Sequence, residues 1–317
     1  MTPTSQRFVI TIASNKGGVG KTTVATNLAI TLRALHEDLP ILLVTLDDQS
    51  IVERMFRIGA RPADVRTLKH AFANRSFDGC SELGQYGVFF VPSSAELEAL
   101  KVRAAEPLTL KRMLDASSFS GLVILDTKSD LEALTRSALA TADLAILPVA
   151  DQASFEEASK AFSLLSEHGG GRERGRVLLT LVDRRTKLDA EGRDLYERLV
   201  AAVDAEGWPR FAAHLSRSPR VEALNSGSAR PRAILHEGKG TAAHRQLREL
   251  AEEVTKLLGL GAAPEEAAGA APTSDPARQP AAAPHTGARR EPRPPSAPPR
   301  DFVADLRSAL FRGLRGR

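Results

Sequence analysis

Short apolar stretches recur along the first 182 residues, separated by segments with the spacing of helices. Polar side chains barely interrupt them, which is typical of strands buried on both faces of a parallel sheet. The stretches are FVITIA (8–13), ILLVTL (41–46), VFFV (88–91), GLVILD (121–126), LAILPV (144–149) and RVLLTLV (176–182). Following the first, Val24, Leu28, Leu32 and Leu35 predict an amphipathic helix. The pattern predicts an α/β fold, a doubly wound and mostly parallel sheet with helices on both faces.

The pattern changes after residue 260. Residues 261–300 contain ten of the 19 prolines and almost no large apolar residue, so we expect a disordered or extended linker. Residues 301–317 regain a helical pattern in which apolar residues lie four apart among arginines: Phe302, Leu306, Leu310 and Leu314. We therefore expect a folded domain over 1–260, a Pro/Ala-rich linker over 261–300 and a short basic amphipathic tail helix over 301–317.

Composition narrows the function classes. Cys80 is the one cysteine, which excludes an internal disulfide and any site that needs several thiolates from one chain. No apolar run approaches the roughly 18 residues of a membrane span, and the start MTPTSQRFVI has no secretory-signal pattern. We expect a cytoplasmic protein.

The stretch GGVGKTT (17–23) follows the first predicted strand and opens the first predicted helix. In that context a glycine-rich stretch forms a loop whose backbone N–H groups hold phosphate oxygens, aided by the helix N-terminus. We expect Lys21 to contact the β and γ phosphates and the Thr22 hydroxyl to bind Mg²⁺. The complete predicted phosphate-binding set is Gly17, Gly18, Val19, Gly20, Lys21, Thr22 and Thr23.

A second lysine precedes this loop, and KGGVGKTT (16–23) resembles the deviant Walker A motif of the ParA/MinD family of ATPases. The resemblance implies that Lys16 reaches across an ATP-bound homodimer to the phosphates held by the other subunit. A lysine presented in this way makes the dimer depend on the γ phosphate, so ATP closes it and hydrolysis opens it. The expected cofactors are ATP and Mg²⁺.

Further stretches of the first 258 residues also resemble this family, and in particular its ParA branch. ILLVTLDDQS (41–50) matches the family's second motif and implies that Asp47 orients the attacking water. GLVILDTKSD (121–130) matches its Walker B strand and implies that Asp126 holds Mg²⁺ through water. The family pattern is also followed by a final helix from about Thr241 and by two stretches, LLTLVDRRTKL (178–188) and LSRSPRVEALNSG (215–227). The resemblance implies that part of Leu215–Ser218 faces the adenine, as it does in relatives.

The chain departs from the family pattern beside the expected site. Thr45 replaces the first aspartate of the second motif, Asp48 replaces the proline after Asp47, and Lys128 and Ser129 replace two prolines after Asp126. Altered contacts around the metal could slow hydrolysis. Since Lys21, Thr22, Asp47 and Asp126 are all present, we expect ATP hydrolysis that is weak alone and stimulated by a partner protein.

The ParA resemblance implies nonspecific DNA binding by the ATP-bound dimer. Residues 261–317 carry nine arginines against six acidic residues, which leaves 34 basic and 33 acidic groups in residues 1–260. Any attraction to DNA by the folded part must therefore come from a local cluster. Residues 208–248 supply one, with eight basic residues against Glu222 and Glu237. The candidates within it are Arg217, Arg220, Arg230 and Arg232.

Two other classes compete with this interpretation. MinD-like members of the family bind membranes through a C-terminal amphipathic helix, and residues 301–317 have a suitable composition; the same helix could instead dock a protein partner. A metabolic or redox enzyme of this fold is disfavoured, because Cys80 is alone and the seven histidines show no metal-ligand spacing. The sequence favours a ParA-type ATPase in DNA segregation or cargo positioning, associated with the nucleoid, or peripheral to the membrane in the alternative.

Overall fold

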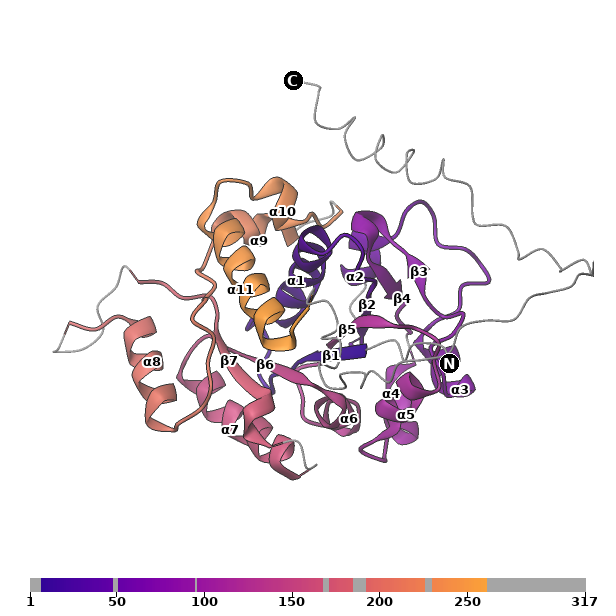
Figure 1. Ribbon diagram of the computed structural model, residues 1–317, viewed down its shortest axis with the longest axis horizontal. Helices are drawn as coiled ribbons and strands as arrows, with labels where there is room; N and C mark the ends of the chain where they lie inside the picture. The colour runs from indigo at the N-terminus through magenta and orange to yellow at the C-terminus, as the bar shows by residue number, and fades with distance from the viewer. Residues whose placement is uncertain are drawn as a thin grey trace, which may run out of the picture. The chain divides into compact units, whose positions relative to one another are not determined.

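A seven-stranded sheet forms the centre of the protein, in the strand order β3-β4-β2-β5-β1-β6-β7 (Figure 1). The computed structural model describes residues 7–47, 51–94, 96–167, 171–184, 192–225 and 230–260. All neighbouring strands pair in parallel except β3, which is antiparallel to β4. The strands are β1 (Arg7–Ile12), β2 (Ile41–Thr45), β3 (Glu82–Leu83), β4 (Phe89–Val91), β5 (Gly121–Asp126), β6 (Leu144–Val149) and β7 (Gly175–Leu179).

Helices cover both faces of the sheet, as the apolar stretches predict. One face carries α1 (Lys21–Leu35), α2 (Ile51–Phe56), α10 (Ile234–Glu237) and α11 (Ala242–Leu258), with α9 (Pro219–Asn225) beside them. The other carries α3 (Leu68–Asn74), α4 (Leu97–Arg103), α5 (Thr109–Asp115), α6 (Ala133–Thr141), α7 (Gln152–Glu167) and α8 (Leu195–Ala205). Two short 3₁₀ turns are η1 (Gln85–Gly87) and η2 (Arg172–Arg174). The predicted doubly wound, mostly parallel fold is confirmed.

The central strand β5 shows why continuous apolar runs are required. All six of its residues are buried. Leu122 and Ile124 pack in the cluster beneath α1 and α11, whereas Val123 and Leu125 pack in the cluster beneath α3 to α6. Both faces of the strand therefore need apolar side chains. The two-residue β3 escaped prediction because so short a strand has no readable periodicity.

The last described helix, α11, begins where the sequence predicts. Thr241 caps it, because the threonine hydroxyl accepts a hydrogen bond from the backbone N–H of His244 at 3.3 Å. Leu250 and Val254 are fully buried in the cluster that includes α1. This packing fixes α11 beside the helix that carries the phosphate-binding loop.

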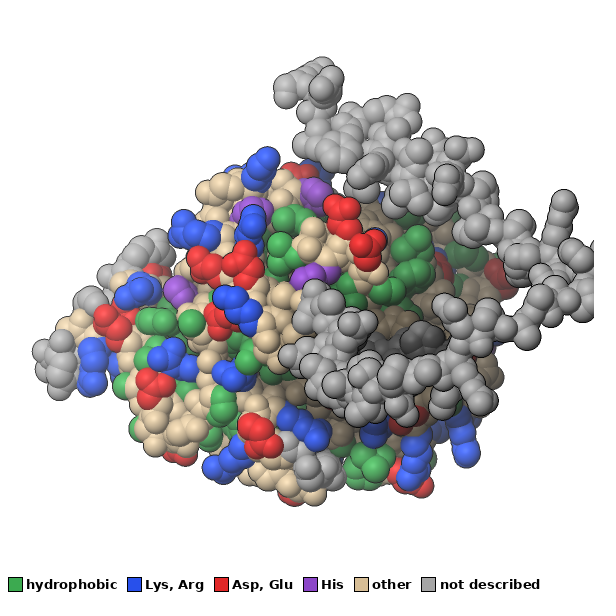
Figure 2. Space-filling view, viewed as in Figure 1, with side chains coloured by type: hydrophobic (Ala, Val, Ile, Leu, Met, Phe, Trp, Pro, Cys, Tyr) green, Lys and Arg blue, Asp and Glu red, His purple; other side chains and the backbone are tan. Residues whose placement is uncertain are grey.

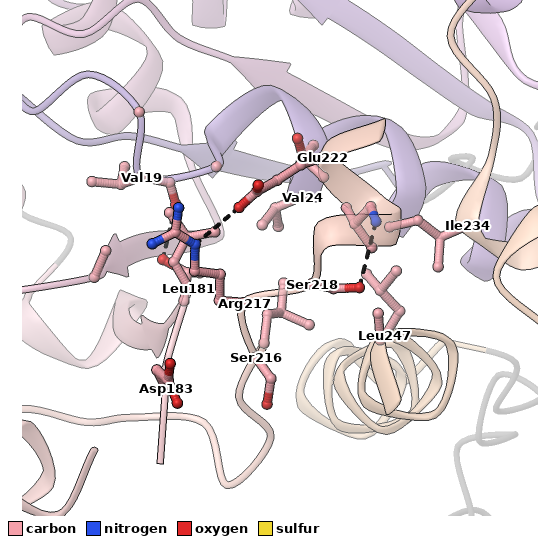
Figure 3. A pocket seen from close by; sticks show the side chains of 18 of the residues that line it. Val19, Val24, Leu181, Asp183, Ser216, Arg217, Ser218, Glu222, Ile234 and Leu247 are labelled. Carbon is pink, nitrogen blue, oxygen red and sulfur yellow. Dashed lines mark hydrogen bonds and ion pairs between the residues drawn. The ribbon is translucent and has the colours of Figure 1, made fainter. Parts of the chain in front are cut away.

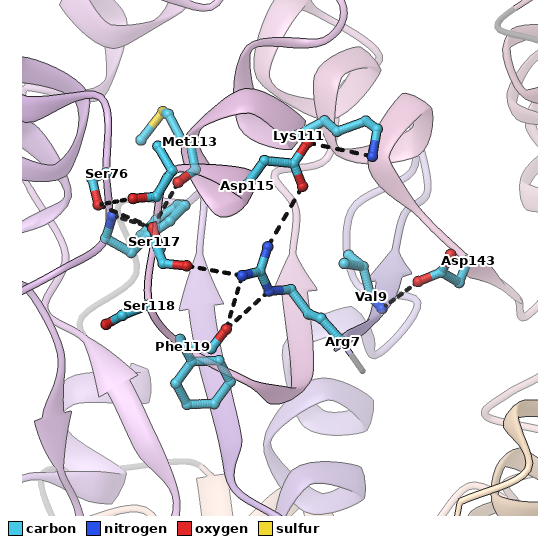
Figure 4. A network of polar contacts seen from close by, with 12 residues as sticks. Arg7, Val9, Ser76, Lys111, Met113, Asp115, Ser117, Ser118, Phe119 and Asp143 are labelled. Carbon is cyan, nitrogen blue, oxygen red and sulfur yellow. Dashed lines mark hydrogen bonds and ion pairs between the residues drawn. The ribbon is translucent and has the colours of Figure 1, made fainter. Parts of the chain in front are cut away.

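Arg7 anchors the amino-terminal end of β1 (Figure 4). Its guanidinium donates hydrogen bonds to the carbonyls of Ser117 and Phe119 at 2.9–3.0 Å and pairs with Asp115 at 3.6 Å. Asp143 accepts from the backbone N–H of Val9 at 2.8 Å. These contacts fix the sheet at the end opposite to the carboxyl ends of its strands.

Residues 1–264 form one compact unit. The linker expected over 261–300 and the tail helix expected over 301–317 lie outside the described residues. Within the part of the chain that the structure describes, no helix is long and apolar enough to cross a bilayer.

Gly121, the first residue of β5, offers a test of this packing. Its φ is +117°, and an added Cβ would collide with the carbonyl oxygen of Pro40. Gly121→Ala should lower the free energy of unfolding by roughly 3 kcal/mol or more, because backbone strain adds to the collision. Urea denaturation followed by the fluorescence of Trp208 would measure the loss.

Gly59 provides the matched control. Its φ is also positive, at +79°, but a Cβ built there meets nothing within 4 Å. Gly59→Ala should cost only about 1–2 kcal/mol, the strain of a left-handed backbone. Equal losses in the two variants would show that close packing around Gly121 does not matter.

Candidate functional site

Three neighbouring strands deliver the predicted site residues to one edge of the sheet. Asp126, the last residue of β5, is paired in register with Ile12 of β1 on one side and with Thr45 of β2 on the other. The chain continues from β1 into the phosphate-binding loop and from β2 to Asp47. Because carboxyl ends of parallel strands share an edge, residues far apart in sequence meet here.

The loop between β1 and α1 has the backbone geometry of a phosphate cradle. Gly18 and Gly20 have φ of +75° and +91°, and a Cβ at either position would point into open space. The requirement for glycine is thus conformational. Helix α1 starts at Lys21 with no side-chain cap, so its first N–H groups remain available to a phosphate. Val19 is buried, and its carbonyl accepts a hydrogen bond from the Thr180 hydroxyl at 2.8 Å.

Lys21 is buried at the centre of the site. Its ammonium donates to the carbonyl of Lys16 at 3.0 Å and to the hydroxyl of Ser129 at 2.7 Å. Burial lowers the pKa of Lys21, while the charges of Asp126 and Asp47 act to raise it. The side chain helps to line a cavity of about 230 Å³, together with Gly18, Gly20, Thr22, Thr23, Asp47 and Ser129. We call this the phosphate cavity.

The Asp126 carboxylate is fully buried beside this cavity. Burial raises the pKa of Asp126 to about 7, with Asp47 adding to the rise and Thr22 and Lys21 opposing it. One carboxylate oxygen, Oδ2, accepts from the Thr45 hydroxyl at 3.4 Å. The other, Oδ1, has no hydrogen-bond partner among the described residues. An unpartnered buried carboxylate oxygen carries a cost that a bound cation would remove.

The oxygen atoms at this site fit a Mg²⁺ ion that is bound partly by the protein and partly by the phosphates of a nucleotide. Oxygen atoms of Thr22 and Asp126 are of the type that Mg²⁺ prefers. Within the described ranges, no group of three His, Cys, Asp or Glu side chains could hold a metal alone. Phosphate oxygens and water would therefore complete the coordination.

Lys16 occupies a different environment from Lys21. Its ammonium forms an ion pair with Asp151, just before α7, and about a third of its side chain is exposed. Asp151 also accepts from the backbone N–H of Ser154 at 2.9 Å. Partial burial acts to raise the pKa of Asp151, but the bonds from Lys16 and Ser154 bring it below the ordinary value. Lys16 does not line the phosphate cavity.

A larger pocket of about 740 Å³ lies on the other side of the loop (Figure 3). It shares Gly18, Gly20 and Thr23 with the phosphate cavity. Its polar groups include Asp183 and Ser216. Apolar side chains form most of its walls, among them Val24, Leu181, Leu215, Ile234 and Leu247. Its size and lining suit a nucleoside, and its lining includes all of Leu215–Ser218, where the sequence places an adenine contact. We call it the base pocket.

The four departures from the family pattern differ in whether they contact Asp126 or line the phosphate cavity. Thr45 contacts Asp126 directly, so an uncharged donor stands where a third carboxylate would otherwise crowd Asp126 and Asp47. Lys128 points to α4, where its ammonium lies 3.4 Å from Glu98, and it does not line the phosphate cavity. Ser129 does line it. Asp48 lies outside the described residues.

The DNA-binding candidates all have partners within the chain. Arg217 pairs with Glu222 at 3.0 Å, and Arg232 pairs with Glu237 at 3.2 Å. Arg220 donates to the carbonyl of Glu237, and Arg230 donates to that of Arg54. Figure 2 shows basic and acidic side chains interspersed over the visible face.

The arginines of residues 208–248 have more acidic neighbours in the structure than that segment of the sequence contains. Within 208–248 the acidic residues are Glu222 and Glu237, but Asp204, Glu249 and Glu252, from outside that window, pair with Arg210, Arg245 and Arg248. The physical reason is helical spacing and folding, which bring acids next to arginines that lie just across the window's border. The cluster is therefore less positive than its sequence indicates.

Sequence reasoning missed two residues that hold the loop in place, Asp151 and Thr180. Asp151 follows β6 by two positions and Thr180 follows β7 by one, and such positions belong to the ligand edge of a parallel sheet. That rule could have found Asp151; Thr180 lies inside the stretch 176–182 that the sequence predicts as strand, whereas β7 ends at Leu179. Ile234 of the base pocket gave no such signal, because a buried N–H bond to Asn27 of α1 at 2.8 Å brings it there.

Comparisons with known proteins agree with this geometry. The sequence profile of an AAA domain matches residues 7–158. The chromosome-partitioning ATPase Soj of Thermus thermophilus is 32% identical over 185 residues, which cover 56% of this chain and 71% of Soj. The chromosome partitioning protein ParA of Caulobacter vibrioides is 28% identical over 197 residues, covering 58% of this chain and 73% of that protein.

A solved structure shows the same fold. The septum site-determining protein MinD of Pyrococcus horikoshii, complexed with Mg-ADP, superposes with a TM-score of 0.64 at 21% identity. The match covers 81% of this chain and 99% of MinD.

The fold and the loop define the protein as a P-loop ATPase, with a phosphate cradle between the first strand and helix of a doubly wound sheet. The two-lysine loop and the similarity to Soj specify it further. The chain belongs to the ParA/MinD family of P-loop ATPases, in the ParA branch.

The buried carboxylate of Asp126 gives the metal-free protein a pH-dependent stability. Its pKa is about 7 in the folded chain and about 3.9 in an unfolded one, so the folded state binds the extra proton between these values. This contribution to stability is present in full below about pH 4 and is lost as the pH rises to about 7. Asp126→Asn should remove that loss.

Urea denaturation of both proteins in chelator, at several pH values from 4.5 to 8.5 (roughly the range over which Asp126 ionises), would test this. The wild type should lose stability relative to Asp126→Asn up to about pH 7 and change little above it. Parallel pH profiles for the two proteins would show that Asp126 ionises normally in the folded chain.

Proposed function

We propose that the chain is a ParA-type ATPase that dimerises on ATP through Lys16, binds DNA without sequence specificity, and releases it when a partner protein stimulates hydrolysis. The cycle would segregate DNA or position a cellular cargo. The observation that supports this most strongly is the division between the two lysines. Lys21 lines the phosphate cavity of its own subunit, whereas Lys16 lies outside it on a partly exposed ion pair.

The residues of the phosphate cavity have distinct parts in this proposal. The loop N–H groups and Lys21 bind and orient the phosphates. Thr22 and Asp126 would hold Mg²⁺, which would neutralise charge on the phosphates. Asp47, two residues beyond β2, is buried and lines the cavity, where its carboxylate would orient the attacking water.

Lys16 would serve the second subunit. Its pairing with Asp151 has to exchange for a contact with the partner's nucleotide, and the triphosphate offers more negative charge than one carboxylate. The ion pair is partly exposed, and such pairs contribute only about 0–1 kcal/mol. Its loss therefore opposes dimerisation little.

Arg220 of α9 and two arginines of the segment before α10, Arg230 and Arg232, are the proposed DNA contacts. Arg220 and Arg232 both meet Glu237, and the side chain of Arg232 is 63% exposed. Exposed pairs of this type exchange readily for phosphate contacts, and dimerisation would double their number. Arg217 lines the base pocket, so we place it with the nucleotide and keep Arg220, Arg230 and Arg232 for DNA.

Cosedimentation with plasmid DNA, with either ADP or a nonhydrolysable ATP analogue, tests the switch. Wild-type protein should sediment with DNA only with the ATP analogue. Lys16→Ala should still bind nucleotide but lose the dimer and the DNA, because its own phosphate cavity is intact. Lys111→Ala, which removes an exposed lysine on α5, is the charge control. DNA binding by Lys16→Ala equal to wild type would overturn the proposed switch.

The same assay separates the membrane alternative. Anionic liposomes replace DNA in a second arm, with the full chain and with residues 1–264, the compact unit. Nucleotide-dependent liposome binding that needs residues 265–317, without DNA binding, would assign the chain to the membrane-positioning class.

The arginine surface has its own test in the salt dependence of DNA binding. Removing Arg220 and Arg232 together should weaken binding and lower the slope of log K against log salt by about 0.9 for each DNA phosphate that the variant no longer neutralises. Arg112→Ala on α5, an exposed arginine that also has an acidic partner, should leave the slope unchanged. If the control and the double variant behave alike, these arginines do not contact DNA.

A further inference from the structure

Ser129 stands at a place where the ParA family pattern has a proline. It follows the β5 carboxylate Asp126 by three positions and lines the phosphate cavity. Its Oγ accepts a hydrogen bond from the Lys21 ammonium at 2.7 Å. That oxygen also lies 3.7 Å from the position that a Cβ on Gly17 would take. The hydroxyl therefore borders both the loop and its lysine.

The backbone on either side of Ser129 is fixed, which holds the hydroxyl in this position. The hydroxyl of Thr127 donates to the carbonyl of Ile12 at 2.9 Å, tying the segment to β1. Asp130 accepts from the hydroxyl of Thr135 at 3.0 Å, tying it to α6. Ser129 itself is exposed, so its side chain faces the space above the loop.

The O–H group of Ser129 donates no hydrogen bond to the described residues. A serine can accept hydrogen bonds and donate one. Lys21, which is a donor, is its one side-chain partner within the described residues, so the Ser129 proton remains for an acceptor in the cavity. An anion that reaches Lys21 would meet this donor as well.

The arrangement of the two cavities determines which phosphate arrives there. The base pocket and the phosphate cavity share Gly18, Gly20 and Thr23, so a nucleotide with its base in the former extends its phosphates across the loop into the latter. Ser129 and Asp47 line the phosphate cavity alone. The terminal phosphate, which is farthest from the base, lies on their side.

We propose that Ser129 is a specificity-determining residue whose hydroxyl donates a hydrogen bond to the terminal phosphate of ATP, so that the site distinguishes a triphosphate from a diphosphate. The inference rests on the proposed nucleotide-binding function. A proline here would offer no donor, so the contact is a property of this chain and not of the family pattern.

A purely positioning role makes a different prediction. If Ser129 only holds Lys21 in place, its loss disturbs a lysine that serves ATP and ADP alike, and both affinities change together. If Ser129 contacts the terminal phosphate, ADP lacks the group concerned. The ratio of the two affinities therefore separates the roles.

The test measures the dissociation constants of Mg-ADP and of a nonhydrolysable Mg-ATP analogue for the full chain. Ser129→Ala should weaken the ATP analogue roughly 10-fold or more, the value of a hydrogen bond to a charged group, and change ADP by less than about 2-fold. Ser129→Thr, which keeps the hydroxyl, should restore most of the loss. Repeating both titrations in the Lys16→Ala background removes any contribution of dimerisation.

Lys128→Ala is the matched control, since this neighbouring departure from the family pattern contacts Glu98 and not the phosphate cavity. It should bind both nucleotides as the wild type does. Equal weakening of ADP and the ATP analogue by Ser129→Ala, or no change in either, would overturn the assignment of Ser129 alone. Failure of the wild type to bind either nucleotide would overturn the proposed function and this inference with it.

Discussion

The Lys21 ammonium and the Asp126 carboxylate are kept largely out of water at the same edge of the sheet, and the rest of the site is arranged around that constraint. Burial disfavours the charged form of each group, because it lowers the pKa of the lysine and raises that of the aspartate. Each opposes the other's shift, but Oδ1 of Asp126 still has no partner among the described residues. A bound metal and phosphates would supply partners for both groups, which favours their binding.

The two lysines illustrate how one loop can serve two purposes. They lie five positions apart, which places Lys21 at the start of a buried helix and Lys16 at the rim of the site. The loop thus presents one charge inward and one outward. Because the Lys16 carbonyl also accepts from Lys21, a change at the rim can reach the phosphate cavity through a single hydrogen bond.

The fold and the core of the site were predictable because both depend on local signals. Uninterrupted apolar strands predict a sheet covered on both faces, and glycines between a strand and a helix predict the phosphate loop. The acidic partners of the arginines were missed for another reason. Arg248 and Glu252 lie one turn apart on α11, a spacing that the sequence shows, but a window that ends at residue 248 excludes Glu252. Ser129 appeared in the sequence only as a departure from a pattern; the contact with Lys21 became visible in three dimensions.

The pairing of Asp126 between Ile12 and Thr45 has a consequence for folding in the cell. A slip of one residue in β5 would turn every side chain of that strand to the opposite face and carry the carboxylate away from Lys21. Nucleotide binds only chains in the native register, so it withdraws them from the pool of misaligned ones by mass action. Bound nucleotide would therefore stabilise the register of a strand that it does not itself touch along most of its length.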